Sequence, residues 1–92
     1  MPDLLHEFWR SEFEGDFGRV SKIGDEFRAK ISPDMKFVFE AFAASWSQAM
    51  RLYEERAYDE YGKSYDHFPD TIYTDADLED QQAYLIMRGN VR

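Results

Sequence analysis

Residues 32–61 read SPDMKFVFEAFAASWSQAMRLYEERAYDEY, and the fold that we predict for the whole chain depends on this stretch. Ser32 can cap a helix, Pro33 suits its first position, and Asp34 favours the positive end of the helix dipole. Apolar side chains then recur at helical spacing along one stripe, which contains Met35, Val38, Phe39, Phe42, Trp46, Ala49, Met50, Tyr53 and Ala57. We therefore predict one long central helix from Pro33 to Tyr61.

Three shorter helices are expected to pack against this central helix. Apolar residues at helical spacing predict one helix within residues 2–13 and another within residues 17–31. Thr74 and Asp77 form a capping-box pattern that begins the last helix, and Gly89 ends it. Residues 63–73 read as a loop with a short extended segment from Thr71 to Tyr73. The predicted fold class is all-α, with about four helices in a single domain of residues 1–92.

The apolar stripe also predicts which side chains form the core. Phe39, Phe42 and Trp46 share one side of the central helix, so they are expected to lie together in the core. The partners that we expect across the core are Phe27 and Trp9. The last helix should add three further core side chains, Leu78, Leu85 and Ile86.

The composition indicates a folded protein of a reducing compartment. Hydrophobic residues make up 43% of the chain and aromatic residues 17%, which argues against intrinsic disorder. There is no cysteine, so disulfides, zinc-thiolate sites and thiol nucleophiles are excluded. The first residues lack the basic and apolar regions of a signal peptide, and no apolar run approaches the roughly 20 residues of a membrane span. We therefore expect a cytoplasmic protein that does not enter a membrane.

The negative charge of the chain is concentrated in residues 54–80. This stretch has ten acidic residues and two basic residues, Arg56 and Lys63, which gives −8, whereas the other 65 residues carry nine of each sign. All six tyrosines fall between Tyr53 and Tyr84, and seven of the eight phenylalanines lie in the N-terminal half. A concentrated negative field attracts basic surfaces and repels nucleic acid and anionic membranes. The C-terminal half therefore has the character of a surface for a basic partner.

Carboxylates and tyrosines at the end of the central helix form the candidate binding surface. Glu55 and Asp59 lie four residues apart, so on a helix their side chains are neighbours, about 5–6 Å apart. Like charges at this spacing weaken a helix slightly, which favours a use for the negative field. Rows of carboxylates can substitute for the phosphates of DNA, and tyrosines between them add contact area at low entropic cost. The predicted partner-binding residues are Glu55, Tyr58, Asp59, Glu60, Tyr61, Tyr65, Asp66 and Asp70.

A second interpretation of the same residues needs no partner. Acidic helix faces are usually only solvated. Arg51 and Arg56 lie four residues before Glu55 and Glu60, where they can neutralise part of the negative field. Tyrosines are also ordinary residues at the edge of a core. The sequence leaves both interpretations open.

Metal-binding patterns are weak. The run from Asp75 to Asp80 begins like a calcium-binding loop, but Asp80 occupies the position that needs glycine, and Ile86 the position that needs glutamate. A helix that starts after Thr74 explains the run better, because acidic residues such as Asp75 and Asp77 favour a first helical turn. We therefore predict no bound metal.

Catalytic patterns are also weak. His6 and His67 are the only histidines, and they lie on different segments of the chain. There is no Ser-His-Asp spacing, no nucleophile elbow and no glycine-rich phosphate loop. The 11 basic residues are scattered and outnumbered, which disfavours direct binding of nucleic acid. We predict a protein without enzymatic activity and without a cofactor.

In composition, the chain resembles the small acidic proteins that phages use to inhibit host defence or nucleic-acid enzymes. This resemblance transfers no residue and no mechanism. The function that we predict is a non-enzymatic inhibitor or binding protein, a DNA mimic whose acidic, tyrosine-rich face occupies a basic surface. The nucleic-acid groove of a host processing or defence enzyme is the surface that fits best. The alternative is a structural or adaptor subunit that forms a homo-oligomer through a hydrophobic helical interface.

Overall fold

The computed structural model describes residues 2–57 and 70–89, and in this part of the chain the fold is mixed α/β rather than all-α. The three strands form one antiparallel sheet in the order β2-β1-β3. The prediction of about four helices on a central helix is therefore wrong. The elements follow the order β1 (Leu4–Arg10), β2 (Gly15–Arg19), α1 (Lys22–Ile31), β3 (Lys36–Ala43), α2 (Trp46–Ala57) and α3 (Asp75–Arg88).

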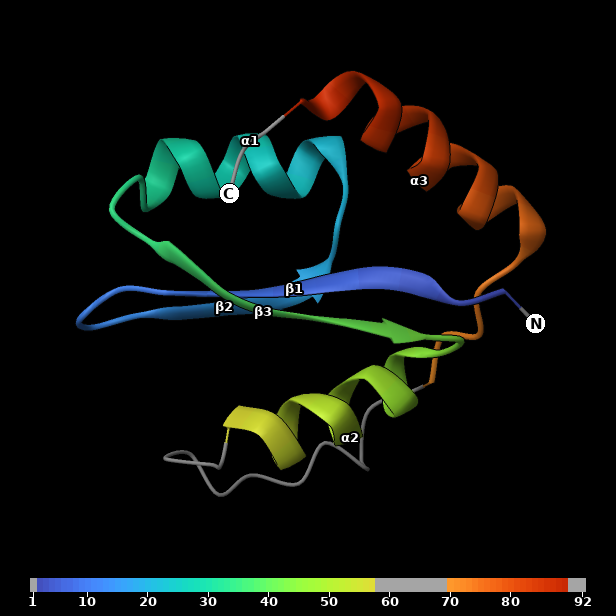
Figure 1. The fold of residues 1–92 in the computed structure, drawn as a ribbon, viewed down its shortest axis with the longest axis horizontal. Coiled ribbons are helices and arrows are strands. Elements are labelled where there is room, and N and C mark those ends of the chain that lie inside the picture. The colour runs from blue at the N-terminus through green and yellow to red at the C-terminus, as the bar shows by residue number, and fades with distance from the viewer. Residues whose placement is uncertain (1, 58–69, 90–92) are drawn as a thin grey trace.

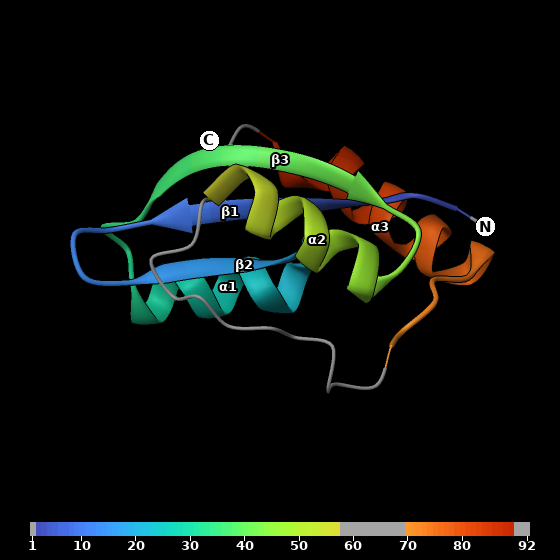
Figure 2. The same cartoon turned by 90° about the horizontal axis from the view of Figure 1, so that it is seen from below.

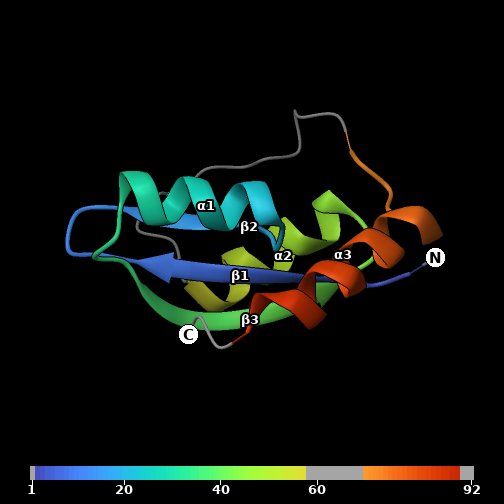
Figure 3. The same ribbon diagram turned by 90° about the horizontal axis from the view of Figure 1, so that it is seen from above.

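The sheet separates the helices into two layers (Figure 1). α1 and α3 cover one face of the sheet, and α2 covers the other face. Seen from below, α2 lies under the side of the sheet that β1 and β3 form (Figure 2). Seen from above, α1 follows β2, and α3 crosses the sheet beside it (Figure 3). The strand order leaves β2 and β3 as the two edges of the sheet.

β1 is the central strand, and its residues from Leu4 to Trp9 are all buried. Successive side chains of a strand point to opposite faces, so a strand that is covered on both faces shows no alternation of polarity. A short apolar run of this kind cannot be distinguished from a buried helix by its spacing. For this reason the helix predicted within residues 2–13 is wrong, and most of these residues form β1.

The stretch of residues 32–61 is divided between a strand and a helix, so the predicted central helix does not form. Ser32 ends α1 instead of starting a new helix, because its N–H donates to the Arg28 carbonyl at 2.8 Å. β3 follows with the run Lys-Phe-Val-Phe, whose aromatic and β-branched residues favour a pleated strand. The apolar stripe correctly predicts a helix only from Trp46 onward, where α2 begins.

The last helix agrees with the sequence. Thr74 and Asp77 form the predicted capping box: Thr74 Oγ1 accepts from the Asp77 N–H at 3.2 Å, and Asp77 Oδ2 accepts from the Thr74 N–H at 2.9 Å. Gly89 follows the helix with a φ of 68°, in the left-handed region that favours glycine. The short extended segment appears as an isolated bridge between Ile72 and Ser45.

The helix predicted within residues 17–31 is correct only in its second part. Its first residues belong to β2, and α1 begins at Lys22. Ser21 caps α1 by accepting a hydrogen bond from the Gly24 N–H at 3.0 Å. Among residues 2–57 and 70–89, every helix falls short of the length and apolar character that crossing a bilayer requires.

The main apolar core lies between the sheet and α2. Aromatic rings pack closely there, with ring centroids 5.3 Å apart for Phe8 and Phe39, and 4.8 Å apart for Phe17 and Tyr53. The smaller residues let α2 approach the sheet closely. The buried residues of this core include Leu4, Phe8, Ala41, Ala43, Ala49, Met50 and Tyr73.

Several predicted core residues lie at the surface instead. Phe42 is 56% exposed, Phe27 65% and Ile86 85%, so these three predictions are wrong, whereas Trp9 is buried as predicted. Phe42 is exposed because strand residues alternate between faces, and its two neighbours in β3 take the buried positions. Four other predicted core residues are half-buried: Phe39, Trp46, Leu78 and Leu85.

Candidate functional site

The structure places two of the eight predicted binding residues. Glu55 is an exposed residue of α2, and Asp70 is an exposed residue before α3. The grouping of all eight residues into one surface therefore stays a prediction. The other six lie outside the described residues: Tyr58, Asp59, Glu60, Tyr61, Tyr65 and Asp66.

Asp70 has a structural role in addition to its charge. Its carboxylate accepts hydrogen bonds from the Ser47 N–H at 2.8 Å and from the Ser47 hydroxyl at 2.9 Å. Ser47 is the second residue of α2, so Asp70 stabilises the N-terminus of that helix from a distant part of the chain. The hydrogen bond from the Ser47 N–H is the main reason that the pKa of Asp70 lies below its usual value.

Exposed carboxylates also occupy the first half of α3. Asp75, Glu79 and Asp80 are exposed, and we call these three residues the acidic surface. Asp77 differs from them, because hydrogen bonding to Thr74, first to its backbone N–H, holds the pKa of Asp77 below its usual value. Arg88, the single basic residue of α3, turns its side chain into the interior. The outer side of α3 therefore carries negative charge that no basic residue of the helix offsets.

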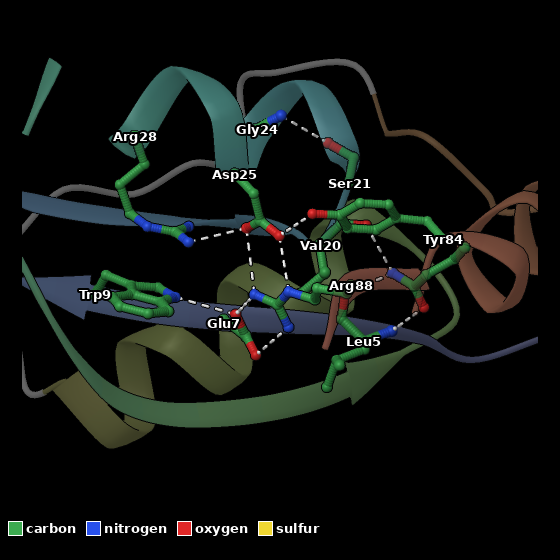
Figure 4. Close-up of polar contacts among 11 residues, drawn as sticks. Leu5, Glu7, Trp9, Val20, Ser21, Gly24, Asp25, Arg28, Tyr84 and Arg88 are labelled. Carbon is green, nitrogen blue, oxygen red and sulfur yellow. Dashed lines mark hydrogen bonds and ion pairs between the residues drawn. The ribbon is translucent and has the colours of Figure 1, made fainter. Parts of the chain in front are cut away.

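A buried ion cluster joins the last turn of α3 to the sheet and to α1 (Figure 4). Arg88 Nη2 lies 2.6 Å from Glu7 Oε1 on β1, and Arg88 Nε donates to Asp25 Oδ2 on α1 at 2.7 Å. Arg28 Nη2 donates to the second oxygen of Asp25 at 2.9 Å. The Tyr84 hydroxyl also donates to Asp25, at 2.5 Å. Two carboxylates and two guanidinium groups therefore balance each other inside the protein.

Solvent has little access to this ion cluster. The side chains of Glu7 and Arg88 are 2% and 5% exposed. The Trp9 indole N–H donates to Glu7 at 3.0 Å, and the Arg28 guanidinium lies 3.8 Å from the centre of the Trp9 ring. Among the described residues, no buried side-chain nitrogen or oxygen lacks a hydrogen-bond partner. A fully paired cluster of this kind holds secondary structure in place.

The pKa values of Arg88 and Tyr84 depend on burial and on the hydrogen bonds that these two side chains make in the cluster. Burial disfavours the charge of Arg88, but hydrogen bonds to Glu7 and Asp25 outweigh it and hold the pKa of Arg88 above its usual value. Burial, together with the hydrogen bond to Asp25, raises the pKa of Tyr84 to about 12. These side chains therefore keep the same protonation state throughout the neutral range.

Gln81 connects the middle of α3 to the sheet. The Leu5 N–H donates to Gln81 Oε1 at 2.8 Å. Gln81 Nε2 in turn donates to the carbonyl of Leu5 at 2.9 Å and to that of Val20 at 3.0 Å. Gln81 is the buried residue of α3, so this helix docks on the sheet through polar groups.

His6 is a buried polar group on the α2 side of the sheet. Its Nδ1 lies 3.0 Å from the Leu4 carbonyl, and its Nε2 lies 2.6 Å from the Tyr73 hydroxyl. A carbonyl can only accept, so we place the hydrogen of the neutral ring on Nδ1, and Nε2 then accepts from Tyr73. Burial lowers the pKa of His6 to about 4 and raises the pKa of Tyr73 to about 12. The pair is therefore neutral at neutral pH.

A seam of open space runs between β2 and α1. A cavity of about 530 Å³ at its hairpin end is lined by Asp16 of β2 and by Phe27, Arg28 and Ile31 of α1, among other residues. A second cavity of about 140 Å³ shares Asp16 and Arg28 with the first and reaches Gly18. We call these two adjoining cavities the β2–α1 seam. Asp16 is exposed, and its backbone pairs with β1, but its carboxylate makes no hydrogen bond or ion pair with the part of the chain that the structure describes.

One side of α1 is apolar, and part of it lines the β2–α1 seam, whereas the inner side of the helix is polar. Ile23 is 80% exposed, Phe27 65% and Ile31 59%. These three residues are spaced four apart, so they form one row along the helix. α1 has no buried residue, and its inner side contributes Asp25 and Arg28 to the ion cluster instead. Such a row of large apolar side chains is unusual for a free surface and points to a contact.

No family model, curated protein or solved structure matches this chain. Sequence reasoning missed the ion cluster because Glu7, Asp25 and Arg88 lie far apart in the chain. One signal was present: Glu7 is a charged residue inside an apolar run, and a charge in such a place needs a buried partner.

Proposed function

We propose that this protein is a non-enzymatic binding protein that engages a basic surface of a protein partner through its acidic surface. The observation that carries the proposal is the outer side of α3, where Asp75, Glu79 and Asp80 are exposed. The only basic residue of that helix is buried in the ion cluster. Carboxylates arranged in this way create a field that attracts cationic surfaces and accelerates association.

The partner class follows from the charge of the whole chain. The net charge of −8 on 92 residues disfavours contact with nucleic acid and favours proteins that bind nucleic acid. A nucleic-acid-processing or defence enzyme has a basic groove of the required kind. Occupying that groove would inhibit such an enzyme without any chemistry by this protein.

The test compares two triple variants that change the net charge equally. One variant neutralises the acidic surface with Asp75→Asn, Glu79→Gln and Asp80→Asn. The matched control neutralises three exposed acidic residues elsewhere, with Asp3→Asn, Glu12→Gln and Asp34→Asn. Both variants and the unmodified protein are used to capture partners from a lysate of the native host, with elution by salt and by duplex DNA.

We expect a partner that salt and duplex DNA release, and that the variant of the acidic surface no longer captures. The control variant should still capture that partner, because the acidic surface is intact. Equal loss in both variants would show that only net charge matters and would contradict a specific surface. A captured partner that neither salt nor duplex DNA releases would contradict the proposal as a whole.

A second candidate function is favoured by the apolar row of α1. Ile23, Phe27 and Ile31 are exposed together, as a subunit interface requires. In this reading, the protein is a structural or adaptor subunit, and its acidic residues serve solubility. Sedimentation measures the oligomeric state of the protein and of its Phe27→Ser variant, and it separates the two functions. A homo-oligomer that the Phe27→Ser substitution dissociates supports the second function.

A further inference from the structure

The two edges of the sheet differ in how they are protected. β3 carries a bulge between the residues that pair with Phe8 and Trp9, and Arg56 of α2 donates to the Glu40 carbonyl at 2.5 Å. Bulges and covering side chains are devices by which natural sheets prevent further strands from pairing. β2 pairs with β1 on one side, and none of the described residues pairs with its other side.

The register shows which backbone groups of β2 point to this free edge. The Val20 N–H donates to the Leu5 carbonyl at 2.9 Å, so the backbone of Val20 faces β1. In an antiparallel ladder, alternate residues face the same neighbour. The N–H and C=O groups of Phe17 and Arg19 therefore point away from β1 and are available to another strand.

Gly18 lies in the middle of β2, where no close contact within the described residues requires a glycine. A Cβ atom at Gly18 would meet nothing within 4 Å, whereas one at Gly15 would lie 3.2 Å from the Phe8 ring. Glycine weakens a strand, and it often marks a place where another backbone approaches closely. The smaller cavity of the β2–α1 seam lies against Gly18, so the space for such an approach is present.

The chemistry of the seam defines what fits it. The Asp16 carboxylate is exposed without a partner among the described residues, and Glu12 and Glu14 are exposed beside it on the hairpin. Phe27 and Ile31 supply apolar surface on the other wall. A strand added to β2 directs every second side chain into this seam. Basic side chains of the added strand match the wall that carries Asp16, and apolar side chains match the wall that Phe27 and Ile31 form.

We propose that β2 accepts an extended segment of a partner protein as a fourth strand of the sheet. A basic side chain of that segment lies next to Asp16, and apolar side chains pack against Phe27 and Ile31. The proposal concerns a different surface from the acidic surface of α3, and it stands whether or not that surface binds a partner. Main-chain hydrogen bonds supply the affinity and the seam supplies the selectivity.

The probe for this test is a capped six-residue lysine-valine peptide, Lys-Thr-Val-Thr-Val-Thr, whose lysine and valines lie on the same face of an extended strand. Amide hydrogen exchange is followed by NMR on the full chain, with and without saturating peptide. Exchange at Phe17 and Arg19 should slow by about tenfold or more, because their N–H groups become hydrogen-bonded. Exchange at Val20 should stay unchanged, since its N–H is already bonded to β1.

Two control peptides separate main-chain pairing from charge. A peptide with glutamate in place of lysine should bind about tenfold more weakly, because Asp16 and its neighbours repel it. A peptide methylated on every backbone nitrogen should bind without slowing exchange at Phe17 or Arg19, or should not bind at all. Equal slowing by the methylated peptide, or no binding of the lysine-valine peptide at millimolar concentration, would overturn the proposal.

Variants of the seam test the same site from the protein side. Gly18→Val fills the smaller cavity, and Phe27→Ala removes apolar surface, so each should weaken peptide binding by about fivefold or more. The matched control is Ile86→Ala, an exposed apolar residue of a helix outside the seam, which should change binding by less than about twofold. If Gly18→Val does not fold, Phe27→Ala decides, and an unchanged affinity in that variant would overturn the proposal.

The variant of the acidic surface keeps the two proposals apart. Neutralising Asp75, Glu79 and Asp80 leaves the seam unchanged, so peptide-induced protection of Phe17 and Arg19 should persist. If protection persists in this variant while the unmodified protein captures no partner that salt and duplex DNA release, the proposed function is wrong and strand addition stands. If protection is absent in the unmodified protein, strand addition is wrong, whatever the acidic surface binds.

Discussion

Arg88 Nη2 lies 2.6 Å from Glu7 Oε1, so the last turn of α3 is tied to the middle of β1. α1 has no buried residue, and the buried residue of α3 is the polar Gln81. The layer that α1 and α3 form is therefore held on the sheet by directional polar groups, in contrast to the apolar packing of α2. Removing one member of such a group leaves its partners buried and unpaired.

Replacing Arg88 by methionine should lower the free energy of unfolding by about 3–5 kcal/mol, because Glu7 and Asp25 would lose the buried guanidinium between them and only Arg28 would remain beside Asp25. Denaturant titration measures this difference. Arg51 is an exposed arginine of α2, so Arg51→Met serves as the control and should cost less than about 1 kcal/mol. Similar losses in both variants would show that the ion cluster contributes no more than a surface charge.

Gln81→Leu should destabilise the protein by about 1–3 kcal/mol, the cost of leaving buried backbone groups unpaired. Leucine has nearly the same volume, but it cannot pair with the Leu5 N–H or the Val20 carbonyl. The Leu5 amide should also exchange faster with solvent. The neighbouring Gln82 is exposed, so Gln82→Leu is the control, and it should leave both measurements unchanged.

Phe8 and Phe42 should respond very differently to replacement by alanine. Phe8 is buried against Phe39 and Tyr53, so Phe8→Ala should cost about 3–5 kcal/mol. Phe42 is exposed on the other face of the sheet, and Phe42→Ala should cost less than about 1 kcal/mol. Thermal melts of the two variants measure this contrast. A large loss for Phe42→Ala would place that residue in an interface or in the core.

The sequence predicts those elements whose signals are local. Thr74 and Asp77 begin α3 through contacts within one turn, and Gly89 ends it through its own conformation, so neighbouring residues suffice to identify both ends. β1 and β3 depend on each other, because their pairing buries residues that are distant in sequence. An apolar run such as the one from Leu4 to Trp9 is compatible with a helix or a strand until its partner is known.

The candidate site was predictable to a smaller extent. Charge counting placed Asp70 in the candidate binding surface, which stays a prediction, but it did not predict the hydrogen bonds of Asp70 to Ser47 on α2. The ion cluster and the β2–α1 seam could not be predicted, because both form where α1 meets the sheet. The order of the strands decides which edge lies under α1, and no local pattern encodes that order.

The stability of the protein should fall as the pH is lowered from about 6.5 to about 4, because of His6. Its pKa is about 4 in the folded protein, against the usual histidine value of 6.5 in an unfolded chain, so in this range the unfolded chain binds more protons. Protons therefore favour unfolding between these two values, and the loss amounts to about 3 kcal/mol when it is complete. Thermal melts across this range measure the loss.

The carboxylates whose pKa values are lowered act in a different range. The pKa values of Asp70 and Asp77 lie below the usual aspartate value of 3.8, so the stability that they contribute is lost only at lower pH. Replacing His6 by glutamine removes its titration, and the variant should lose much less stability between pH 6.5 and 4. NMR titration of the His6 ring should give a midpoint near pH 4. A midpoint near 6.5, or an unchanged slope in His6→Gln, would show that the buried ring does not control this transition.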